Sequence, residues 1–476
     1  MSVENTGKRA AGLQNEKGNN FTHIFFLGIG GIGMSALARF YQSKGYQIGG
    51  YDRSPSPLTD KLQTEGIRII FDDETASVPA AFLDELHTLI IRTPAVPENE
   101  KLYTYFQEKG FRIVKRSEAL GFITQQMRAL CVAGTHGKTT TSTILAHLLY
   151  QSDINCNAFL GGISQNYGTN LLLSQESNYV VVEADEFDRS FHHLTPYISV
   201  ITAVDPDHLD IYGDADHYRE SFEYYTSLIQ PGGALILKQG VSITPRLAEN
   251  VRLYTYGVVE DESQEKPDFY ADNIQIGKGE IHFDFHTPTE VFVNLKLGVP
   301  VYINIENSVA AMAVAWLNGV NASELRLGLA SYTGIYRRFN IHVNNEHIAY
   351  IDDYAHHPTE LAASIESIRR LFPERKLTGV FQPHLYSRTR DFADGFAKVL
   401  STLDEVILLP IYPAREEPIA GVDSEMLLSR ITCGKKSIVE KSELISKLQG
   451  RENEVIMTLG AGDIDRMVPE IKNALQ

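Results

Sequence analysis

The chain has 476 residues, which is enough for about three domains of ordinary size. Its hydrophobic fraction of 43% and charged fraction of 22% are typical of globular proteins and argue against a disordered or fibrous chain. With 43 Lys and Arg against 60 Asp and Glu, the net charge is -17. No basic run offsets that charge, so we expect no nucleic-acid partner.

Cysteine usage and hydropathy indicate a reducing, aqueous compartment. Cys131, Cys156 and Cys433 are spaced too widely for a metal motif or a disulfide framework. The amino terminus lacks the apolar core of a signal peptide, and no run of about 18 apolar residues occurs. We therefore expect a cytoplasmic protein with no membrane partner. The sequence does not decide between a monomer and a homodimer.

The order of apolar and polar segments predicts an α/β fold. Residues 1–20 are polar and rich in Gly and Asn, which predicts a disordered tail. After them, short β-branched runs alternate with amphipathic stretches, as expected for parallel strands joined by crossover helices. The ten clearest runs are residues 23–29, 46–52, 88–93, 129–134, 179–185, 198–204, 348–353, 378–383, 405–410 and 454–460.

A different pattern in residues 253–304 predicts a small antiparallel patch. Apolar and polar side chains alternate there with period two, without helical segments between the strands. We place domain boundaries near residues 123 and 330, where helical stretches end and a new strand-led unit begins. The predicted domains are residues 21–123, 124–329 and 330–476, the second of which contains the antiparallel patch.

A first glycine-rich turn follows the first apolar run and opens a helical stretch. Its glycines are Gly28, Gly30, Gly31 and Gly33, and Asp52 ends the next run. Glycines let the backbone approach a phosphate, and the helix amino terminus offers its dipole. The pattern favours nucleotide or diphosphate binding over a tight turn that binds nothing. By itself it fits a dinucleotide, with Asp52 on a ribose.

A second glycine loop lies between the run at 129–134 and a helical stretch. Its residues are Gly134, Thr135, His136, Gly137, Lys138, Thr139 and Thr140. Lys138 can neutralise phosphate oxygens, Thr139 can offer a hydroxyl to Mg²⁺, and backbone N–H groups can cradle the anion. The spacing is shorter than the general phosphate-loop pattern, whose first Gly would fall at Val132. We still expect a site for the phosphates of ATP.

Carboxylates follow the run at 179–185. They are Glu183, Asp185, Glu186 and Asp188. A carboxylate at the carboxyl end of a parallel strand lies where nucleotide-linked Mg²⁺ is held, which favours Glu183 as a ligand. The alternative is a solvated, acidic start of a helix. His208, in the loop after the run at 198–204, is from spacing alone as much a structural residue as a ligand.

The last third of the chain places polar loops after two further runs. Residues 352–358 read DDYAHHP, and residues 383–390 read PHLYSRTR. Side chains at the carboxyl ends of strands belong to the edge of an open α/β sheet where ligands bind. The alternative is loop and helix-capping chemistry, with Thr359 or Asp391 as the cap.

Taken together, these motifs resemble those of one family, the Mur ligases of bacterial cell-wall synthesis. The resemblance runs from about residue 22 to the end and rests on GIGGIGMSALA, AGTHGKTTT, VEADEFDRSF, DPDHLD, IENSVAA, YRRFN, DDYAHHPTE, FQPHLYSRTRD, YPAREEPIAGVDS and LGAGDI. It implies a Rossmann-like domain for a UDP-sugar, a central ATPase domain and a carboxyl-terminal Rossmann-like domain that closes over the site. It also implies that the first glycine turn faces a UDP diphosphate and not NAD.

The resemblance assigns roles to individual residues. Lys138 and Thr139 would hold ATP phosphates and Mg²⁺, Glu183 would hold a first metal, and His208 would hold a second. The implied nucleotide contacts are Asn307, Arg338 and Asp353, and the residues near the reacting groups are His356, His384 and Arg388. The sequence departs from the family at Glu306, Phe187 and Leu385, which stand where relatives often have His, a small residue and Arg.

The implied reaction is ATP-dependent ligation of L-alanine to the carboxylate of UDP-N-acetylmuramate through an acyl phosphate. A related ligase that attaches a whole tripeptide to the same sugar is the nearest alternative, although FQPHLYSRTRD favours L-alanine. An NAD-dependent oxidoreductase would explain the first glycine turn but leaves Lys138 without a role. A nucleotide-binding regulator without catalysis is the third reading.

Overall fold

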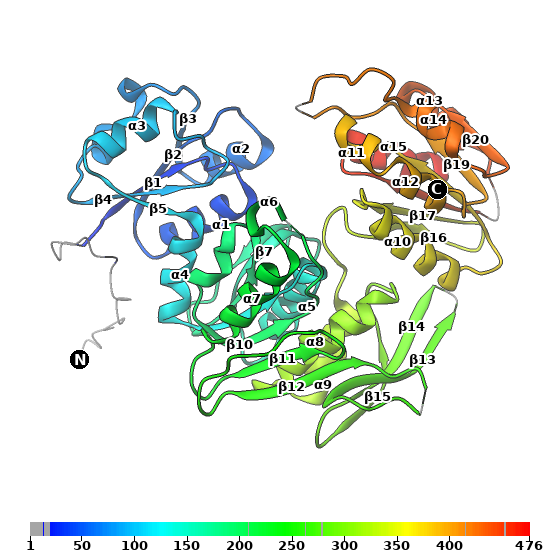
Figure 1. Cartoon of the computed structure of the whole chain (residues 1–476), viewed down its shortest axis with the longest axis horizontal. Coiled ribbons are helices and arrows are strands. Elements are labelled where there is room, and N and C mark those ends of the chain that lie inside the picture. Colours follow the sequence, from blue (N-terminus) through cyan, green and yellow to red (C-terminus); the bar gives the residue numbers. More distant parts are fainter. Residues whose placement is uncertain are drawn as a thin grey trace, which may run out of the picture. The chain divides into compact units, whose positions relative to one another are not determined.

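The computed structural model of the protein describes residues 13, 20–207, 209–261, 263–277, 279–414, 416–451 and 454–476 (Figure 1). Nearly all of the predicted tail lies outside these residues. The chain divides into two compact units. The first unit comprises Met1–Ile163, Tyr167–Tyr256 and Ala310–Glu324, and the second comprises Ser164–Asn166, Gly257–Val309 and Leu325–Gln476.

The first unit begins with a five-stranded parallel sheet in the order β3-β2-β1-β4-β5. Its strands are β1 (His23–Leu27), β2 (Gln47–Tyr51), β3 (Arg68–Ile70), β4 (Thr88–Arg92) and β5 (Arg112–Lys115), and its helices are α1 (Ile32–Ser43), α2 (Pro57–Thr64), α3 (Lys101–Glu108) and α4 (Arg116–Gln126). Side chains of β1 alternate between two apolar clusters. Ile24 and Phe26 pack with α1 and α4, whereas Phe25 and Leu27 pack with α3. Both faces of this sheet are therefore covered.

The strand order reverses at β1, because the chain adds β2 and β3 on one side of it and then β4 and β5 on the other. In open α/β sheets, ligands bind at the carboxyl ends of the strands where the order reverses in this way. The first glycine turn leaves β1 at that point.

The first unit continues with strands of a second sheet. The elements are β6 (Arg128–Ala133), α5 (Lys138–Tyr150), β7 (Asn157–Ser164), β8 (Thr169–Leu172), β9 (Tyr179–Ala184), the 3₁₀ helix η3 (Phe187–His193), β10 (Pro196–Ile201), α6 (Leu209–Tyr212), α7 (Ala215–Thr226), β11 (Ala234–Lys238) and β12 (Arg252–Val258). This sheet has ten strands in the order β15-β14-β13-β12-β11-β10-β6-β9-β7-β8. Its middle is parallel, since β6 pairs with β9 and β10, β10 with β11, and β11 with β12. One apolar cluster joins α1 and β1 to β6 and β9, so the first unit has a shared core.

The second unit contains an antiparallel meander of β13 (Phe269–Gly277), β14 (Glu280–His286) and β15 (Val291–Lys296). The antiparallel patch predicted for residues 253–304 is therefore confirmed for these strands. It differs for β12, because residues 252–256 pair in parallel with β11. Period-two alternation marks a strand with one exposed face and carries no information about the direction of its neighbour. The helices α8 (Ile303–Leu317) and α9 (Ala322–Ser331) follow.

The second unit ends with a six-stranded sheet in the order β16-β17-β21-β18-β19-β20, parallel except for the β16–β17 pair. Its elements are β16 (Asn340–Asn344), β17 (Ile348–Asp353), α10 (Pro358–Leu371), β18 (Lys376–Phe381), α11 (Tyr386–Asp391), α12 (Ala393–Leu400), β19 (Glu405–Leu408), α13 (Ser424–Arg430), β20 (Lys435–Ile438), α14 (Lys441–Leu448), β21 (Glu454–Leu459), the 3₁₀ helix η4 (Asp463–Met467) and α15 (Val468–Leu475). The fold is α/β, built on the three sheets described above, and each of the ten predicted runs overlaps a strand. In the part of the chain that the structure describes, no helix combines the length and the apolar character needed to cross a bilayer.

The helix-capping alternative for the polar loops of the last third is right for one loop, but Thr359 and Asp391 are not the caps. α10 begins at Pro358, and the side chain of His357 caps it by accepting a hydrogen bond from the Thr359 N–H at 3.3 Å. α11 ends at Asp391, and Phe392 precedes α12. A ring nitrogen of histidine can act as an acceptor in the same way as the usual side-chain oxygens.

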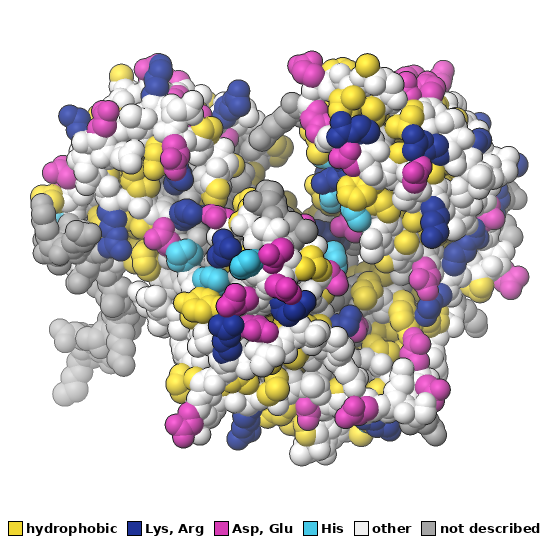
Figure 2. All heavy atoms as spheres, viewed as in Figure 1, with side chains coloured by type: hydrophobic (Ala, Val, Ile, Leu, Met, Phe, Trp, Pro, Cys, Tyr) yellow, Lys and Arg dark blue, Asp and Glu magenta, His cyan; other side chains and the backbone are white. Residues whose placement is uncertain are grey.

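Lys and Arg side chains are interspersed with Asp and Glu side chains over the face drawn in Figure 2. One network, at the amino ends of β18, β19 and β21, is more buried. Lys376 contacts Glu405 at 3.0 Å and Glu454 at 2.8 Å, and Arg451 contacts the same carboxylates at 2.9 and 3.0 Å. Burial opposes ionisation of Glu405, but hydrogen bonds and charge from Arg451 and Lys376 outweigh it and lower its pKa to about 2.

We predict that Glu405→Gln lowers the melting temperature of the second unit at pH 7 by about 3–10 °C, since the variant loses hydrogen bonds between charged groups. The folded-state pKa lies below the ordinary value of 4.5, so this stabilisation is present above that value and disappears as the pH falls towards about 2. Calorimetry between pH 7 and pH 2 should show the two proteins converging. Glu366→Gln, which removes an exposed partner of Arg370, is the control. A difference that does not depend on pH would contradict the prediction.

Candidate active site

The first glycine turn connects β1 to α1 and is held by Asp52. The Gly30 N–H donates a hydrogen bond to Asp52 Oδ2 at 2.7 Å. One carboxylate oxygen of Asp52 thus stabilises the loop backbone. The isolated dinucleotide interpretation, with Asp52 directed at a ribose, does not account for this contact, and the role of Asp52 in binding a UDP-sugar stays a prediction.

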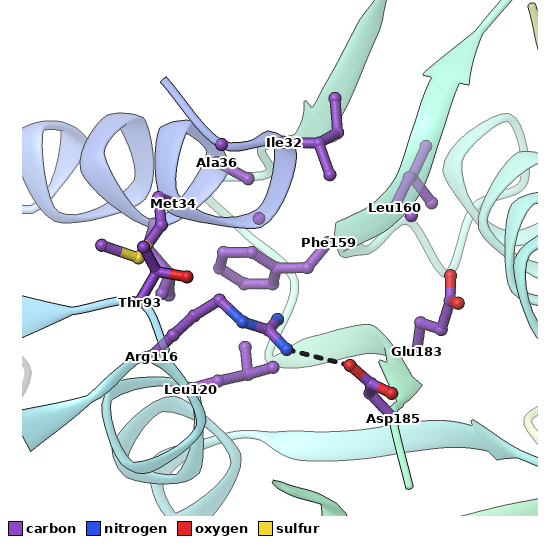
Figure 3. A pocket seen from close by; sticks show the side chains of 14 residues that line it. Ile32, Met34, Ala36, Thr93, Arg116, Leu120, Phe159, Leu160, Glu183 and Asp185 are labelled. Carbon is purple, nitrogen blue, oxygen red and sulfur yellow. Dashed lines mark hydrogen bonds and ion pairs between the residues drawn. The ribbon is translucent and has the colours of Figure 1, made fainter. Parts of the chain in front are cut away.

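A pocket of about 320 Å³ opens beside this turn, within the first unit (Figure 3). It is lined by Gly31, Ile32, Gly33, Met34, Ala36, Leu37, Thr93, Arg116, Leu120, Phe159, Leu160, Gly161, Glu183 and Asp185. Two of the predicted site motifs, the first glycine turn and the acidic segment after β9, therefore face one cavity. Apolar walls with a few polar groups are typical of ligand pockets.

The second glycine loop lies between β6 and α5, and the end of β10 supports it. Gly134 has φ of +130°, and a Cβ there would overlap Thr202 Oγ1 and lie 2.8 Å from the Ala203 nitrogen. The Thr202 hydroxyl in turn donates to the His136 carbonyl. Thr135 Oγ1 donates to the Asp205 carbonyl at 2.9 Å. The loop therefore takes its shape from the neighbouring parallel strand, and Gly134 is required by this close approach.

Lys138, the first residue of α5, is bound by a buried carboxylate. Its Nζ lies 2.7 and 2.9 Å from the two oxygens of Glu186, and it also donates to the Gly134 carbonyl at 2.6 Å. The Glu186 side chain is only 3% exposed. Burial raises the pKa of Glu186, and the Lys138 ammonium opposes this shift. The pair holds the lysine beside the loop that is predicted to receive phosphates.

The other acidic residues after β9 have separate cationic partners. Asp185 Oδ2 accepts from Arg116 at 3.2 Å, and Asp188 pairs with Lys115 at 2.7 Å. The backbone of Asp188 is left-handed, with φ of +52°, inside η3. The alternative of an acidic helix start holds in part, because η3 begins at Phe187 and Asp188 lies in its first turn. Ion pairs with Lys138, Arg116 and Lys115 nevertheless bind three of the four carboxylates.

Glu183 lies close to Thr139, as the metal prediction requires. Thr139 Oγ1 donates to Glu183 Oε1 at 3.1 Å. His208 lies outside the described residues, and among those that are described no cluster of three or more His, Cys, Asp and Glu could hold a metal. A magnesium ion bound through nucleotide phosphates needs only one or two protein ligands, so Thr139 and Glu183 suit such an ion.

Gly161 of β7 permits the position of the Glu183 carboxylate. A Cβ at residue 161 would overlap Glu183 Oε2 and lie 2.8 Å from its Cδ. Any other residue at this position must displace the carboxylate.

In the second unit, one predicted nucleotide residue, Arg338, lies over the ring of Tyr354, which follows Asp353 in the chain. Arg337 and Arg338 both lie over its ring, at 4.7 and 5.7 Å from the centroid. Arg337 also donates to the Gly462 carbonyl at 2.8 Å, so it serves the backbone. Asp353 accepts from the Phe339 N–H at 3.1 Å and from the Ser364 hydroxyl, and burial raises its pKa. Asp353 thus holds the loop that presents Arg338.

The two predicted histidines lie near each other in the second unit. The rings of His356 and His384 are 6.4 Å apart, and His384 stacks on Tyr412 at 5.8 Å. Burial lowers the pKa of both rings, and Arg388 adds to this effect. Leu385 follows His384 with φ of +67°, a strained conformation for a branched side chain. The lowered pKa of His356 and His384 favours the neutral form of both rings at pH 7.

The remaining predicted residues occupy separate places. Asn307 and Glu306 lie in α8, and Asn307 Nδ2 donates to Asn304 Oδ1 at 3.2 Å. Phe187 is 40% exposed at the start of η3. Thr140 lies in the first turn of α5.

Three residues that the sequence did not single out as site residues contribute to this site. Glu186 binds Lys138, Arg116 lines the pocket, and Gly161 gives space to Glu183. The position of Arg116 directly after β5 was a possible signal, but β5 is short and was not among the clearest apolar runs. Gly161 carried no local signal, because its role depends on a strand that is distant in sequence.

We predict that Gly161→Ala weakens Mg²⁺-dependent ATP binding by about 10-fold or more, because it moves the carboxylate that is predicted to hold the metal. Calorimetric titration with ATP at several Mg²⁺ concentrations measures this effect. Gly277→Ala is the control, since nothing lies within 4 Å of a Cβ there and its φ is not positive. If the Mg²⁺ dependence of ATP binding is unchanged in Gly161→Ala, the assignment of Glu183 as a metal ligand is contradicted.

Comparison with known proteins identifies the family of this chain. Three family models match in succession: "Mur ligase family, catalytic domain" over residues 23–128, "Mur ligase middle domain" over 132–315 and "Mur ligase, glutamate ligase domain" over 337–462. The chain is 57% identical to the UDP-N-acetylmuramate–L-alanine ligase of Phocaeicola vulgatus, over 95% of this chain and 98% of that protein. It is 55% identical to the enzyme of that name from Porphyromonas gingivalis, over 95% of this chain and 99% of that protein.

Among solved structures, UDP-N-acetylmuramate-alanine ligase MurC from Thermotoga maritima superposes with a TM-score of 0.77 at 26% identity, over 95% of this chain and 100% of that chain. A murein peptide ligase from Psychrobacter arcticus has the same fold, with a TM-score of 0.65 at 20% identity, over 95% of this chain and 98% of that chain. With such identity to curated relatives over nearly its whole length, this protein belongs to the Mur ligase family.

Proposed function

We propose that the protein joins L-alanine to the carboxylate of UDP-N-acetylmuramate at the expense of ATP, forming ADP, phosphate and UDP-N-acetylmuramoyl-L-alanine in peptidoglycan synthesis. The observation that carries the proposal is the pocket of about 320 Å³, whose wall includes both the first glycine turn and Glu183. The sugar nucleotide and the phosphate-transfer site can therefore meet in one cavity. The relatives with 55–57% identity bear the name of this activity.

Activation of the carboxylate is the electrostatic problem of this reaction. A carboxylate must approach the terminal phosphate of ATP, and two like charges about 4 Å apart repel by about 4 kcal/mol at an effective dielectric of 20. Lys138 lies at the amino terminus of α5 beside the loop carbonyl of Gly134. We assign to Lys138 the neutralisation of phosphate charge, and to Glu186 the positioning of its ammonium.

Metal ions supply further positive charge to the phosphates when they are bound. Thr139 and Glu183 would hold a first Mg²⁺, and His208 is proposed as a ligand of a second. Asn307 and Arg338 are proposed to contact the nucleotide, with Asp353 acting on Arg338 through the Phe339 backbone. Gly28, Gly30, Gly31, Gly33 and Asp52 are proposed to form the site of the UDP diphosphate.

The second half of the reaction requires a deprotonated amine to attack the acyl phosphate. Burial lowers the pKa of His356 and His384, which favours the neutral form of each ring, the form that can act as a general base. We propose that they and Arg388 form the amino-acid site of the carboxyl-terminal domain. We further propose domain boundaries near residues 123 and 330 and a cytoplasmic location.

We expect ADP release only when UDP-N-acetylmuramate and L-alanine are both present with ATP and Mg²⁺. A coupled assay that varies the amino acid singly, and then replaces it with the tripeptide L-alanyl-γ-D-glutamyl-meso-diaminopimelate, measures this requirement. Faster turnover with the tripeptide would identify the recycling ligase instead. Binding of NAD without substrate-dependent ADP release would support the oxidoreductase.

We predict that Lys138→Ala reduces turnover by at least about 100-fold. The variant should still fold, with a lowered melting temperature, because a buried carboxylate loses its counter-charge. The single variant leaves Glu186 buried without its cation, so the double variant Lys138→Ala/Glu186→Gln, which also removes the carboxylate charge, is the second test. Lys101→Ala removes an exposed surface cation and serves as the control. Substantial ligation by either Lys138 variant would reject the assignment.

A further inference from the structure

Arg116, the first residue of α4, presents its guanidinium to the pocket of the first unit (Figure 3). Its Nη2 donates to Asp185 Oδ2 at 3.2 Å. Its Nη1 lies close to the glycine turn, since a Cβ at Gly33 would be 3.1 Å from it. The guanidinium is thus placed between the turn at the start of α1 and the acidic end of β9.

Both carboxylate oxygens of Asp185 accept hydrogen bonds, one of them from this arginine. Its Oδ1 accepts from the Phe187 N–H at 3.1 Å, and its Oδ2 accepts from Arg116. A carboxylate with one oxygen on the backbone and the other on a guanidinium has a defined orientation. Asp185 therefore fixes the position of Arg116 and has little capacity left for a metal.

The ion pair alone does not explain an arginine at this position. The side chains of Arg116 and Asp185 are 25% and 39% exposed, and ion pairs with that much solvent contribute little to stability. Within the part of the chain that the structure describes, Asp185 is the one ion-pair partner of Arg116, so most of its five N–H donors remain for a ligand. Lys115 offers a contrast, because it pairs with Asp188 in the same way but does not line the pocket.

The charge of the pocket lining also requires a cation. The described lining residues include two carboxylates, Glu183 and Asp185, and Arg116 is the one cation among them. An anionic substrate would be repelled by this wall without Arg116, in a protein whose net charge is already -17. Guanidinium binds phosphate and carboxylate oxygens in pairs, which gives direction as well as charge.

We infer that Arg116 binds an oxyanion of the UDP-sugar substrate, and that Asp185 is the residue that positions it. The inference rests on the proposed substrate. Two groups of that substrate share the required chemistry: the diphosphate, which the first glycine turn is proposed to bind, and the sugar-linked carboxylate, which is proposed to react with ATP. Arg116 thus contributes to substrate recognition, separately from the phosphate loop around Lys138.

Direct binding tests the inference without relying on turnover. Isothermal titration calorimetry with UDP-N-acetylmuramate should show that Arg116→Met weakens binding by about 10- to 100-fold, the loss expected for hydrogen bonds between charged groups. Binding of ATP with Mg²⁺ should stay within about twofold, because Lys138 and Thr139 are unchanged. Lys115→Met is the matched control and should leave both affinities within about twofold. Arg116→Lys should recover part of the affinity, since it restores the charge without the paired donors.

A second ligand shows which oxyanion of the substrate Arg116 binds. UDP-N-acetylglucosamine has the diphosphate but no carboxylate. If Arg116→Met weakens its binding as much as that of UDP-N-acetylmuramate, Arg116 binds the diphosphate. Weakening confined to UDP-N-acetylmuramate would assign it to the carboxylate. For Asp185→Asn, steady-state kinetics should give a KM for UDP-N-acetylmuramate raised by about 3- to 10-fold with kcat nearly unchanged, because a mispositioned cation weakens substrate binding.

Wild-type affinity in Arg116→Met, or an equal loss in Lys115→Met, would overturn the inference and would show that both cations only tether α4. A wild-type protein that binds no UDP-sugar would instead overturn the proposed function, and the inference with it. If Arg116→Met does not fold, as judged by its melting temperature, the comparison of Arg116→Lys with Lys115→Met decides the question.

Discussion

The ion pair between Lys138 and Glu186 is the interaction on which the phosphate loop depends. A lysine that is 14% exposed and lies among loop carbonyls needs a counter-charge, and Glu186 supplies it with both oxygens. Burying a carboxylate is costly unless a cation compensates it, so each member of the pair requires the other. The result is an ammonium group that is already ordered at the amino terminus of α5, where an incoming triphosphate would meet it.

The segment that carries Glu186 also connects two parts of the site. Within the six residues 183–188, Glu183 and Glu186 contact residues of α5, whereas Asp185 and Asp188 pair with Arg116 and Lys115 at the start of α4. The phosphate loop and the wall of the pocket are therefore held by one short stretch of backbone. Its left-handed residues in η3 allow neighbouring carboxylates to point towards different helices.

Neighbouring charged residues of the second unit also have different roles. Arg337 donates hydrogen bonds to backbone carbonyls of the loop after β21, and its neighbour Arg338 lies over Tyr354. Asp353 stabilises the same loop through the Phe339 N–H, which explains why a buried carboxylate with a raised pKa is tolerated there. In a Mur ligase, such preorganisation lets a loop present one cation to a ligand without a further ordering cost.

The sequence by itself determined the α/β class, the ten main strands and both glycine loops, because those features depend on local periodicity and on glycine placement. It also indicated Lys138, Thr139 and Glu183 as a nucleotide site. It did not reveal the parallel pairing of β12 or the capping of α10 by His357. Nor could it assign separate roles to the four carboxylates within residues 183–188, because nothing in the local sequence distinguishes them. Only the tertiary structure decided that Glu186 holds Lys138, that Asp185 holds Arg116 and that Gly161 makes room for Glu183, because each of these contacts joins strands and helices that are distant along the chain.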